Sequence, residues 1–247
     1  MVDDDSEDKI ADIIKSYRDP RIYLIKSDKN LGISTSMNLA LSEVKTEFVA
    51  RMDSDDIAHP DRFAIQIDYL EKHRDCMIVG SMVDYIDDTE PLKLVNISDA
   101  ITVKFEKPQI MAGLLNCNSS IANSTTIFRT VSVQKVFDKY GFYYSESPIF
   151  DGAEDDEFWT RFCLMDQSLA VEILSAKLLY YRVWDNNYSS LRSKNRILAH
   201  SQIIKAFLER LDVKIPEDLL QFWVLFGVYQ RLVMFFIFYT KSVETSL

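Results

Sequence analysis

The sequence predicts an α/β fold in which helices flank a mostly parallel sheet and a helical tail closes the chain. Strand-like and helix-like segments alternate through about the first ninety residues, which is typical of parallel strands joined by helical crossovers. Hydrophobic residues make up 47% of the chain and aromatic residues 12%, enough for a filled interior. The length of 247 residues fits one large domain or two lobes that share a core.

The first half of the chain supplies the alternating elements. Three segments carry apolar residues at helical spacing: 8–17, 34–44 and 60–73. Three β-rich runs alternate with them: 21–26, 47–52 and 76–85. Ser34 is a candidate N-cap for the second helix. The strand at 47–52 ends directly before an acidic loop, and open α/β sheets bind ligands beyond the carboxyl ends of their strands.

The second half is less regular. Its expected elements are a helix at 101–115, a short strand at 125–128, a helix at 154–166 and a β-like run at 169–183. The helix at 154–166 places Phe158, Trp159 and Phe162 on its buried side. Two long helices are expected after about residue 190. The second half therefore predicts a further lobe followed by a helical tail.

The composition excludes several classes of protein. A formal charge of −10 at pH 7 argues against general nucleic-acid binding, which requires a basic face. The three cysteines, Cys76, Cys117 and Cys163, lack CxxC spacing and indicate reduced core thiols of a cytoplasmic protein. The acidic N-terminal residues carry no apolar run, so no signal peptide is expected.

An apolar stretch at 222–239 is about long enough to cross a bilayer. Gln230 and Arg231 lie at its centre, where each would be costly in lipid. The stretch is therefore expected to be a packed or interfacial helix, compatible with a peripheral membrane contact or with a homodimer contact.

The first candidate site is the acidic loop that contains Asp53, Asp55 and Asp56. Three like charges within four residues are destabilising unless water or a cation takes up the charge. Alternate carboxylates on a turn suit Mg²⁺ or Mn²⁺, which prefer oxygen ligands. The competing interpretation is a solvated acidic turn that caps the next helix.

The second candidate site is the acidic start of the helix at 154–166. Glu154, Asp155 and Asp156 stand in its first turn, where the helix dipole favours negative charge, so a purely structural role is also open. Two acidic clusters, one in each half of the chain, are less common than a single one, so their joint presence favours a functional role. One could hold a metal and a diphosphate while the other supplies a general base.

Six motifs occur in a recognisable order: VDDDS at 2–6, NLG at 30–32 followed by Asn38, ARMDSDDIAHPDRF at 50–63, VGS at 79–81, EDDEFWTR at 154–161 and YRV at 181–183. With these motifs the chain resembles the family 2 glycosyltransferases of the Rossmann-like GT-A fold, which use nucleotide-sugar donors and usually invert the anomeric centre. The resemblance covers about residues 1–190. Taken together, the motifs are specific for this family, whereas either acidic cluster alone would be weak evidence for it.

The resemblance implies roles for individual residues. The donor-binding residues would be Asp4, at the nucleotide base, and Asn30, Gly32, Asn38, Arg51 and Asp53. Asp55, together with Asp53, would coordinate the Mn²⁺ or Mg²⁺ that bridges the donor diphosphate. Asp155 would be the general base for the acceptor hydroxyl, and Glu154 and Trp159 would bind the acceptor.

The function that the resemblance implies is metal-dependent, inverting transfer of a sugar. The expected donor is a UDP-sugar, and the acceptor is a hydroxyl of a carbohydrate, lipid-linked or protein acceptor in polysaccharide or glycoconjugate synthesis. Residues 1–98 would form the nucleotide-sugar-binding part, 99–190 the acceptor-binding part and 191–247 a C-terminal helical extension.

The sequence departs from the family pattern at three places. Met1 falls where the family has already completed its first strand and helix, so we expect this chain to lack them. Asp5 stands where the family's turn carries a glycine, and Trp184 stands where the YRV motif usually continues with histidine. These departures leave open a non-catalytic or truncated binding or scaffold protein.

A third class is an Asp-x-Asp phosphohydrolase or nucleotidyltransferase. A phosphohydrolase of the haloacid-dehalogenase type would need a threonine two residues after its second aspartate, but Ile57 occupies that position after Asp55. The chain also has no glycine-rich phosphate loop of the P-loop kind.

Overall fold

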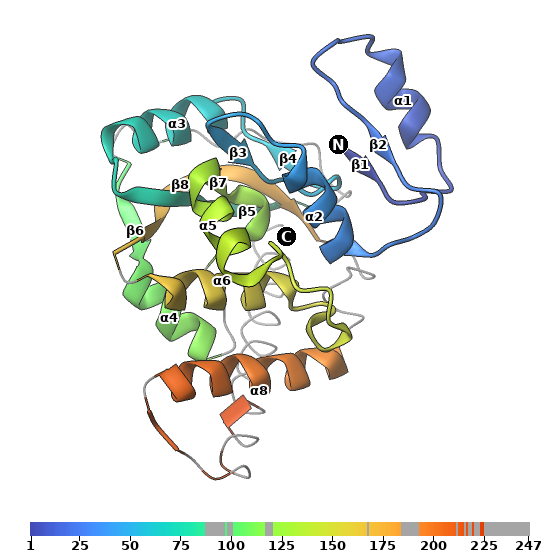
Figure 1. Cartoon of the computed structure of the whole chain (residues 1–247). Coiled ribbons are helices and arrows are strands. Elements are labelled where there is room, and N and C mark those ends of the chain that lie inside the picture. The colour runs from blue at the N-terminus through green and yellow to red at the C-terminus, as the bar shows by residue number, and fades with distance from the viewer. Residues whose placement is uncertain are drawn as a thin grey trace, which may run out of the picture.

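The computed structural model describes residues 1–86, 97, 101–116, 121–166, 168–183, 193–210, 212–214, 216, 219 and 223–224. The described strands are β1 (Val2–Asp3), β2 (Ile25–Lys26), β3 (Phe48–Ala50), β4 (Ile57–Ala58), β5 (Cys76–Ile86), β6 (Val103–Glu106), β7 (Ile127–Arg129) and β8 (Ala170–Arg182). The described helices are α1 (Ile10–Ser16), α2 (Ile33–Ser42), α3 (Arg62–Lys72), α4 (Lys107–Leu115), α5 (Thr130–Tyr140), α6 (Glu154–Met165) and α8 (Ser193–Arg210), with short 3₁₀ turns η1 (Asn123–Thr125) and η2 (Pro148–Phe150). Figure 1 shows these elements around one central sheet.

The central sheet has six strands in the order β3-β7-β5-β8-β4, and β6 also pairs with β8. The long strands β5 and β8 are parallel neighbours, whereas β7 pairs antiparallel with both β3 and β5. β4 and β6 each pair antiparallel with β8. The sheet is therefore mixed.

The predicted α/β class with flanking helices is confirmed, but the expectation of mostly parallel pairing needs correction. β3 and β5 do run in the same direction, as the alternation of strands and helices predicted. They are not neighbours, because β7 from the second half of the chain lies between them. Local periodicity identifies strands but does not say which strands pair, since pairing depends on contacts between distant segments.

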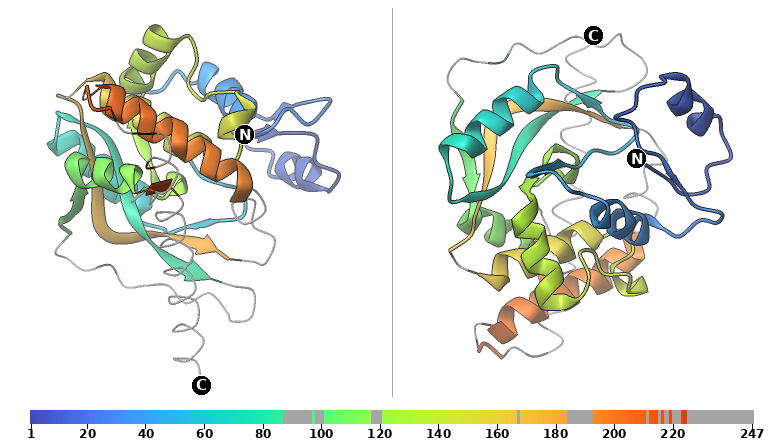
Figure 2. Two further views of the ribbon diagram at one scale, coloured as in Figure 1. Left: turned by 90° about the horizontal axis from the view of Figure 1, so that it is seen from below. Right: turned by 45° about the horizontal axis from the view of Figure 1, so that its top comes forward.

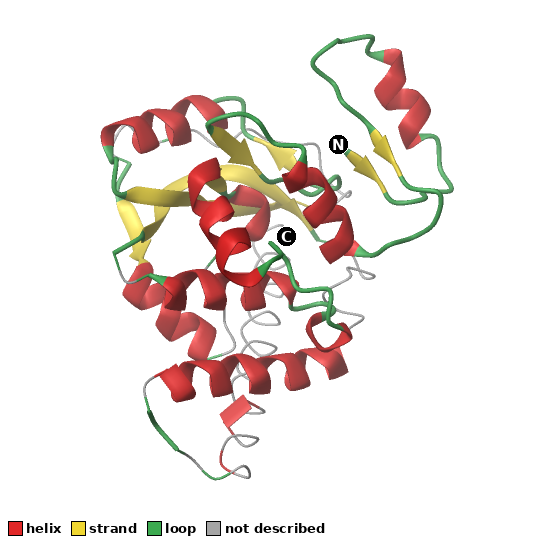
Figure 3. Ribbon diagram, viewed as in Figure 1, coloured by secondary structure: helices red, strands yellow, loops and turns green. Residues whose placement is uncertain are grey.

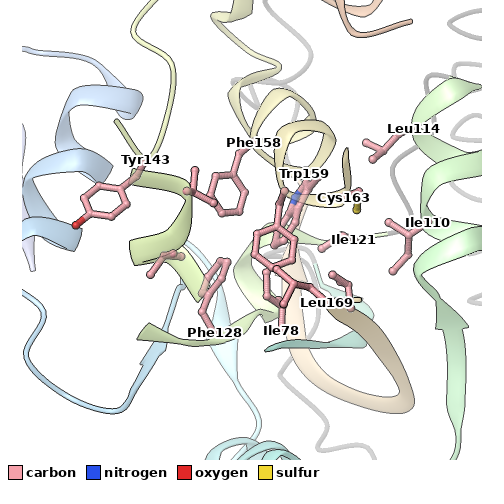
Figure 4. Packing of buried hydrophobic residues seen from close by; sticks show 14 of the residues in the cluster. Ile78, Ile110, Leu114, Ile121, Phe128, Tyr143, Phe158, Trp159, Cys163 and Leu169 are labelled. Carbon is pink, nitrogen blue, oxygen red and sulfur yellow. The ribbon is translucent and has the colours of Figure 1, made fainter. Parts of the chain in front are cut away.

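Side chains that alternate along the strands build a core on each face of the sheet. Leu70 of α3 packs with Val79, Ile127 and Leu174 on one face. On the other face, the neighbouring positions Ile78, Phe128 and Ile173 pack against residues of α4, α5, α6 and α8. Figure 2 shows α3 covering one face and α4, α6 and α8 covering the other, and Figure 4 shows the larger cluster in detail. Because successive side chains of a strand point to opposite faces of the sheet, the position of a residue in its strand determines which core it joins.

Strands β1 and β2 form a small parallel sheet of their own, joined through α1. Figure 3 shows this unit beside the main sheet, with α2 between the two. The turn after β1 contains Asp5 at a φ of 63°, in the left-handed region that favours glycine. The position where the resemblance expected a glycine therefore does require a positive φ, and an aspartate adopts it here.

Two local predictions were wrong for identifiable reasons. Ser34 lies inside α2, whose N-cap is Gly32 at a φ of 85°. The first part of the helix predicted at 101–115 is strand β6, and α4 begins at Lys107 behind a capping box of Glu106 and Gln109. Burial alternates along β6 with the strand period of two, a pattern that the helical prediction overlooked.

The apolar stretch at 222–239 lies outside the described residues except at 223–224, as does Trp184. Among the described residues, none of the helices combines the length and the hydropathy that a membrane span requires. Cys76 and Cys163 are buried free thiols, as predicted, and Cys117 lies outside the described residues.

Candidate functional site

The acidic loop connects β3 to β4 and crosses the carboxyl end of the central sheet. Asp53, Asp55 and Asp56 each offer one carboxylate oxygen, and these three oxygens lie within 4.8 Å of one another. Asp55 is exposed, Asp53 is partly exposed and Asp56 is buried. The predicted cluster is therefore formed in space.

Arg51 holds Asp53 in a bidentate ion pair. Its Nη1 and Nη2 atoms each lie 2.6 Å from an oxygen of the Asp53 carboxylate. Burial of Arg51 disfavours its charge, but the charge and hydrogen bond of Asp53 together with the charges of Tyr144 and Asp155 outweigh this effect, and the pKa of Arg51 is raised. This fixed fork orients Asp53, because a guanidinium and a carboxylate match in only a few geometries.

Ser124 of η1 completes the support of Asp53. Its hydroxyl donates to Asp53 Oδ2 at 2.8 Å and accepts from the backbone N–H of Asp53 at 3.1 Å. Arg51 Nη1 also donates to the Ser124 oxygen at 2.9 Å. No local signal in the sequence identifies Ser124 as a partner of Asp53, because 71 residues separate the two.

Asp56 is anchored to the end of β8. Its Oδ1 accepts from the backbone N–H of Arg182 at 3.1 Å, and Arg182 Nε donates to the carbonyl of Asp55 at 2.9 Å. Burial, aided by the charges of Asp53 and Asp55, raises the pKa of Asp56, although a hydroxyl contact from Ser124 opposes the shift. The acidic loop is thus fastened to the strand that carries the YRV motif.

One carboxylate oxygen of this cluster lacks a hydrogen-bond donor in the part of the chain that the structure describes and is therefore suited to bind a cation. Asp56 Oδ2 is buried and has no hydrogen-bond donor among the described residues, since the single Ser124 proton goes to Asp53. An acceptor of this kind is costly to bury. Together with the exposed carboxylate of Asp55 it offers hard oxygen ligands, so the residues present fit Mg²⁺ or Mn²⁺.

The second acidic cluster opens α6. Glu154 is buried, and burial together with the charge of Asp155 raises its pKa to about 8. Asp155 is half-buried, and its Oδ1 accepts from the backbone N–H of Asp156 at 2.8 Å. Asp156 is 2% exposed and lies 3.1 Å from Nε2 of His200 on α8. Three consecutive carboxyl groups therefore occupy three different environments.

The two acidic clusters act on the same basic and phenolic groups. Burial lowers the pKa of Arg51, whereas the charge of Asp53 and, to a smaller extent, that of Asp155 raise it. Burial and then the charges of Asp56, Asp53, Asp55 and Asp155 raise the pKa of Tyr181 to about 12. The pKa values of Arg51 and Tyr181 thus respond to charges of both clusters, whose residues lie about one hundred positions apart in the chain.

The N-terminal motifs meet at the start of α2. Asp4 accepts hydrogen bonds from the backbone N–H groups of Leu31 at 2.8 Å and Gly32 at 2.9 Å. The turn after β1 is thereby joined to the segment before α2, and Asn30 beside it is exposed. The predicted donor-binding residues Asp4, Asn30 and Gly32 therefore lie together.

Two predicted site residues serve the fold in this structure. Asn38 donates to the carbonyl of Tyr144 at 2.9 Å and accepts from its N–H at 2.7 Å, so its amide joins α2 to the loop before α6. Trp159 is fully buried and stacks on Phe128 with ring centroids 5.7 Å apart. The assignment of Trp159 as an acceptor-binding residue is therefore corrected, because a side chain with no exposed surface contacts no ligand.

The family model and the curated proteins that match this chain are all of glycosyltransferases. The model of "Glycosyl transferase family 2" matches residues 1–137. An uncharacterized glycosyltransferase of Methanocaldococcus jannaschii is 28% identical over 203 residues, covering 81% of this chain and 65% of the relative. The UDP-Glc:alpha-D-GlcNAc-diphosphoundecaprenol beta-1,3-glucosyltransferase WfaP of Escherichia coli is 25% identical over 207 residues, covering 83% of this chain and 73% of the relative. The chain thus spans slightly less than two thirds of the archaeal relative's length.

Solved structures show the same fold. TarS of S. aureus in complex with UDP-GlcNAc aligns with a TM-score of 0.57 at 19% identity, over 93% of this chain and 70% of that chain. The mannosyltransferase PcManGT of Pyrobaculum calidifontis, in complex with GDP-Man and Mn²⁺, aligns with a TM-score of 0.54 at 14% identity, over 92% of this chain and 59% of that chain. The predicted GT-A fold is confirmed by these similarities.

Proposed function

The chain belongs to glycosyl transferase family 2, and from that membership we propose that it transfers a sugar from a nucleotide-diphosphate donor to a hydroxyl acceptor. The observation that carries the proposal is the group of carboxylate oxygens from Asp53, Asp55 and Asp56, which lie within 4.8 Å of one another and suit a cation. Residues 1–98 would bind the donor and 99–190 the acceptor, with 191–247 as a helical extension.

Donor binding is assigned to the acidic loop and the N-terminal turn. Asp4, Asn30 and Gly32 would contact the nucleoside, and Arg51 would fix Asp53 against the donor. Asp55 and Asp53, joined by Asp56, would hold Mn²⁺ or Mg²⁺. When bound, that ion would neutralise the negative charge that develops on the departing diphosphate. A UDP-sugar is the preferred donor, supported by the donor in the printed name of WfaP and by the UDP-GlcNAc bound to TarS.

Chemistry at the acceptor is assigned to the start of α6. Asp155 would take the proton of the acceptor hydroxyl while the oxygen attacks the anomeric carbon. The bond between that carbon and the diphosphate oxygen breaks with its electron pair going to the diphosphate, and the anomeric centre is inverted. Glu154, whose pKa is raised to about 8, would carry a proton at neutral pH and donate a hydrogen bond to the acceptor.

Calorimetric titration with UDP and with GDP, each with and without Mn²⁺, tests the donor half of the proposal. We expect metal-dependent binding of UDP that is lost in Asp55→Ala. Asp68→Ala, which removes an exposed carboxylate on α3, is the matched control and should bind as the wild type does. Preference for GDP would overturn the donor assignment, and binding that ignores the metal would overturn the cation site.

Asp155→Asn tests the acceptor half. The variant should bind UDP normally yet fail to transfer, because an amide cannot accept the proton. Transfer at the wild-type rate by this variant would exclude Asp155 as the base. Normal UDP binding by a wild-type chain that never transfers to any acceptor would favour the binding or scaffold alternative.

A further inference from the structure

A buried contact joins helix α8 to the acidic start of α6. Nε2 of His200 lies 3.1 Å from Oδ2 of Asp156, and each of these side chains is 2% exposed. The two helices pack along each other, as Figure 1 shows, and Ile203 and Phe207 of α8 share the larger hydrophobic cluster with residues of α6. A buried carboxylate is costly unless it is paired, so the contact with His200 offsets the cost of burying Asp156.

Asp156 in turn holds the proposed base. Its backbone N–H donates to Oδ1 of Asp155 at 2.8 Å. This N–H is one of the first four of the helix, which have no carbonyl partner within the helix, so the carboxylate of the preceding residue accepts it. One oxygen of Asp155 is thereby fixed. The direction in which this planar carboxylate faces an acceptor hydroxyl therefore depends on the position of Asp156.

The first turn of α6 begins without a side-chain cap. Its N-cap residue is Ala153, and within the described residues no side chain caps this end of the helix. Four acidic residues, 154–157, fill the turn, and their like charges repel one another even though the helix dipole favours each of them. The hydroxyl of Thr160 donates to the carbonyl of Asp156 at 2.7 Å and secures its backbone, whereas His200 holds its side chain from outside the helix. Asp156 is therefore a residue through which α8 holds the turn.

We propose that His200 is a positioning residue for the base: it holds the carboxylate of Asp156, and Asp156 in turn holds the carboxylate of Asp155. This inference rests on the proposed function. The contact is attractive when Nε2 of His200 carries a proton, which either a neutral or a charged imidazole can supply. A base displaced by about 1 Å can lose about a hundredfold in rate, so the link matters for the chemistry rather than for donor binding. His200 lies outside residues 1–137, which the family model matches, and it gives the C-terminal extension a part in the reaction.

Amide hydrogen exchange on the full chain tests the link without requiring turnover. The double variant Asp156→Asn, His200→Leu removes the contact and the buried charge together, so the chain should still fold. We expect the amide at position 156 to lose about tenfold of its protection against exchange. His200→Gln should keep the protection of the wild type, because its side-chain amide still offers an N–H to the carboxylate. Unchanged protection in the double variant would overturn the proposal.

Phe207→Leu is the matched control for a loosened α8. Phe207 is fully buried on the same helix, about 10 Å further along its axis than His200. This variant weakens the packing of α8 but keeps the contact with Asp156, so the amide at position 156 should stay protected. An equal loss of protection in Phe207→Leu and in the double variant would overturn the proposal, because packing alone would then explain the effect.

Release of UDP measures the consequence for the base. The probes are UDP-glucose and UDP-N-acetylglucosamine, with Mn²⁺ present and water as the acceptor. The double variant should lower kcat about tenfold to a hundredfold at an unchanged KM for the donor, and His200→Gln should keep the wild-type kcat. A wild-type kcat in the double variant would overturn the proposal. A wild type that binds UDP but releases none from either probe would overturn the proposed function alone, and the exchange experiment would still decide whether His200 holds Asp156.

Discussion

Asp156 of α6 and His200 of α8 face each other in the protein interior, with Oδ2 and Nε2 3.1 Å apart and each side chain 2% exposed. Asp156 directly follows the proposed base Asp155 and shares its first helical turn. This contact therefore joins α8 to the acidic first turn of α6.

Loss of the histidine should destabilise the fold. His200→Ala leaves the Asp156 carboxylate buried opposite a cavity, and breaking a buried polar pair of this kind costs about 3 kcal/mol. Urea unfolding would measure the change. Leu198→Ala, at an exposed position of the same helix, is the control and should change stability by less than about 0.5 kcal/mol. Equal losses in the two variants would mean that the pair contributes nothing specific.

Glu154 should make the fold less stable as the pH rises. Its pKa is raised from 4.5 to about 8, first by burial and then by Asp155, so between these values only the folded chain binds the proton. The free energy of unfolding should then fall by up to about 1.4 kcal/mol per pH unit in this window, whereas below about pH 4.5 the contribution is fully present. Denaturant unfolding across the window would measure the slope.

Comparison with a glutamine variant isolates this group from others that titrate. Glu154→Gln carries no titrating proton, so its stability should depend less on pH than that of the wild type. Glu71→Gln, at an exposed position of α3, should keep the wild-type slope. Parallel curves for the wild type and Glu154→Gln would show that Glu154 is already ionised across the window.

The geometry of Arg51, and not only its charge, should matter for the donor. Arg51→Lys keeps a positive charge but cannot span both Asp53 oxygens and the Ser124 hydroxyl. We expect metal-dependent UDP affinity to fall about tenfold, through loss of charge-assisted hydrogen bonds. Calorimetry would measure it, with exposed Arg74→Lys as the control. Unchanged affinity would mean that Asp53 needs no fork to hold its position.

Gly80 should resist substitution because of one neighbouring atom. A Cβ at this position would lie 2.6 Å from Cδ1 of Ile173 and 3.2 Å from Oγ1 of Thr125. Gly80→Ala should therefore cost about 1–3 kcal/mol through overpacking. Thermal or urea unfolding would measure the loss.

A second substitution separates this clash from any backbone effect. Ile173→Val deletes the Cδ1 atom, so the double variant Gly80→Ala, Ile173→Val should be more stable than the sum of the two single losses predicts. Simple additivity would assign the cost of Gly80→Ala to something other than Ile173.

The sequence predicted the features that depend on short stretches of chain. Strand β3 followed by an acidic loop, and the acidic start of α6, were both found where the motifs placed them. Burial of Phe158, Trp159 and Phe162 followed from helical spacing. These predictions succeeded because periodicity and charge placement are local properties.

Features that depend on tertiary contacts were not predictable. Ser124 supports Asp53 across 71 residues, and β7 separates β3 from β5, yet neither segment signals its partner. Trp159 was assigned to two incompatible environments, the buried side of a helix and a ligand contact, and packing decided for the first. Asn38 has its amide committed to the backbone of Tyr144, a contact that spans 106 residues.

The stacking of Trp159 on Phe128 also gives the chain an optical label. The indole is fully enclosed, stacked nearly parallel to the ring of Phe128 at an interplanar angle of 2°, and edge-on to Phe158. Phe128 belongs to the strand that follows the turn carrying Ser124. With Trp184 and Trp223 replaced by phenylalanine, the emission of this single indole would be blue-shifted and would shift to the red only when the contact between α6 and β7 opens. Unfolding of that region could thus be followed in real time without attaching a dye.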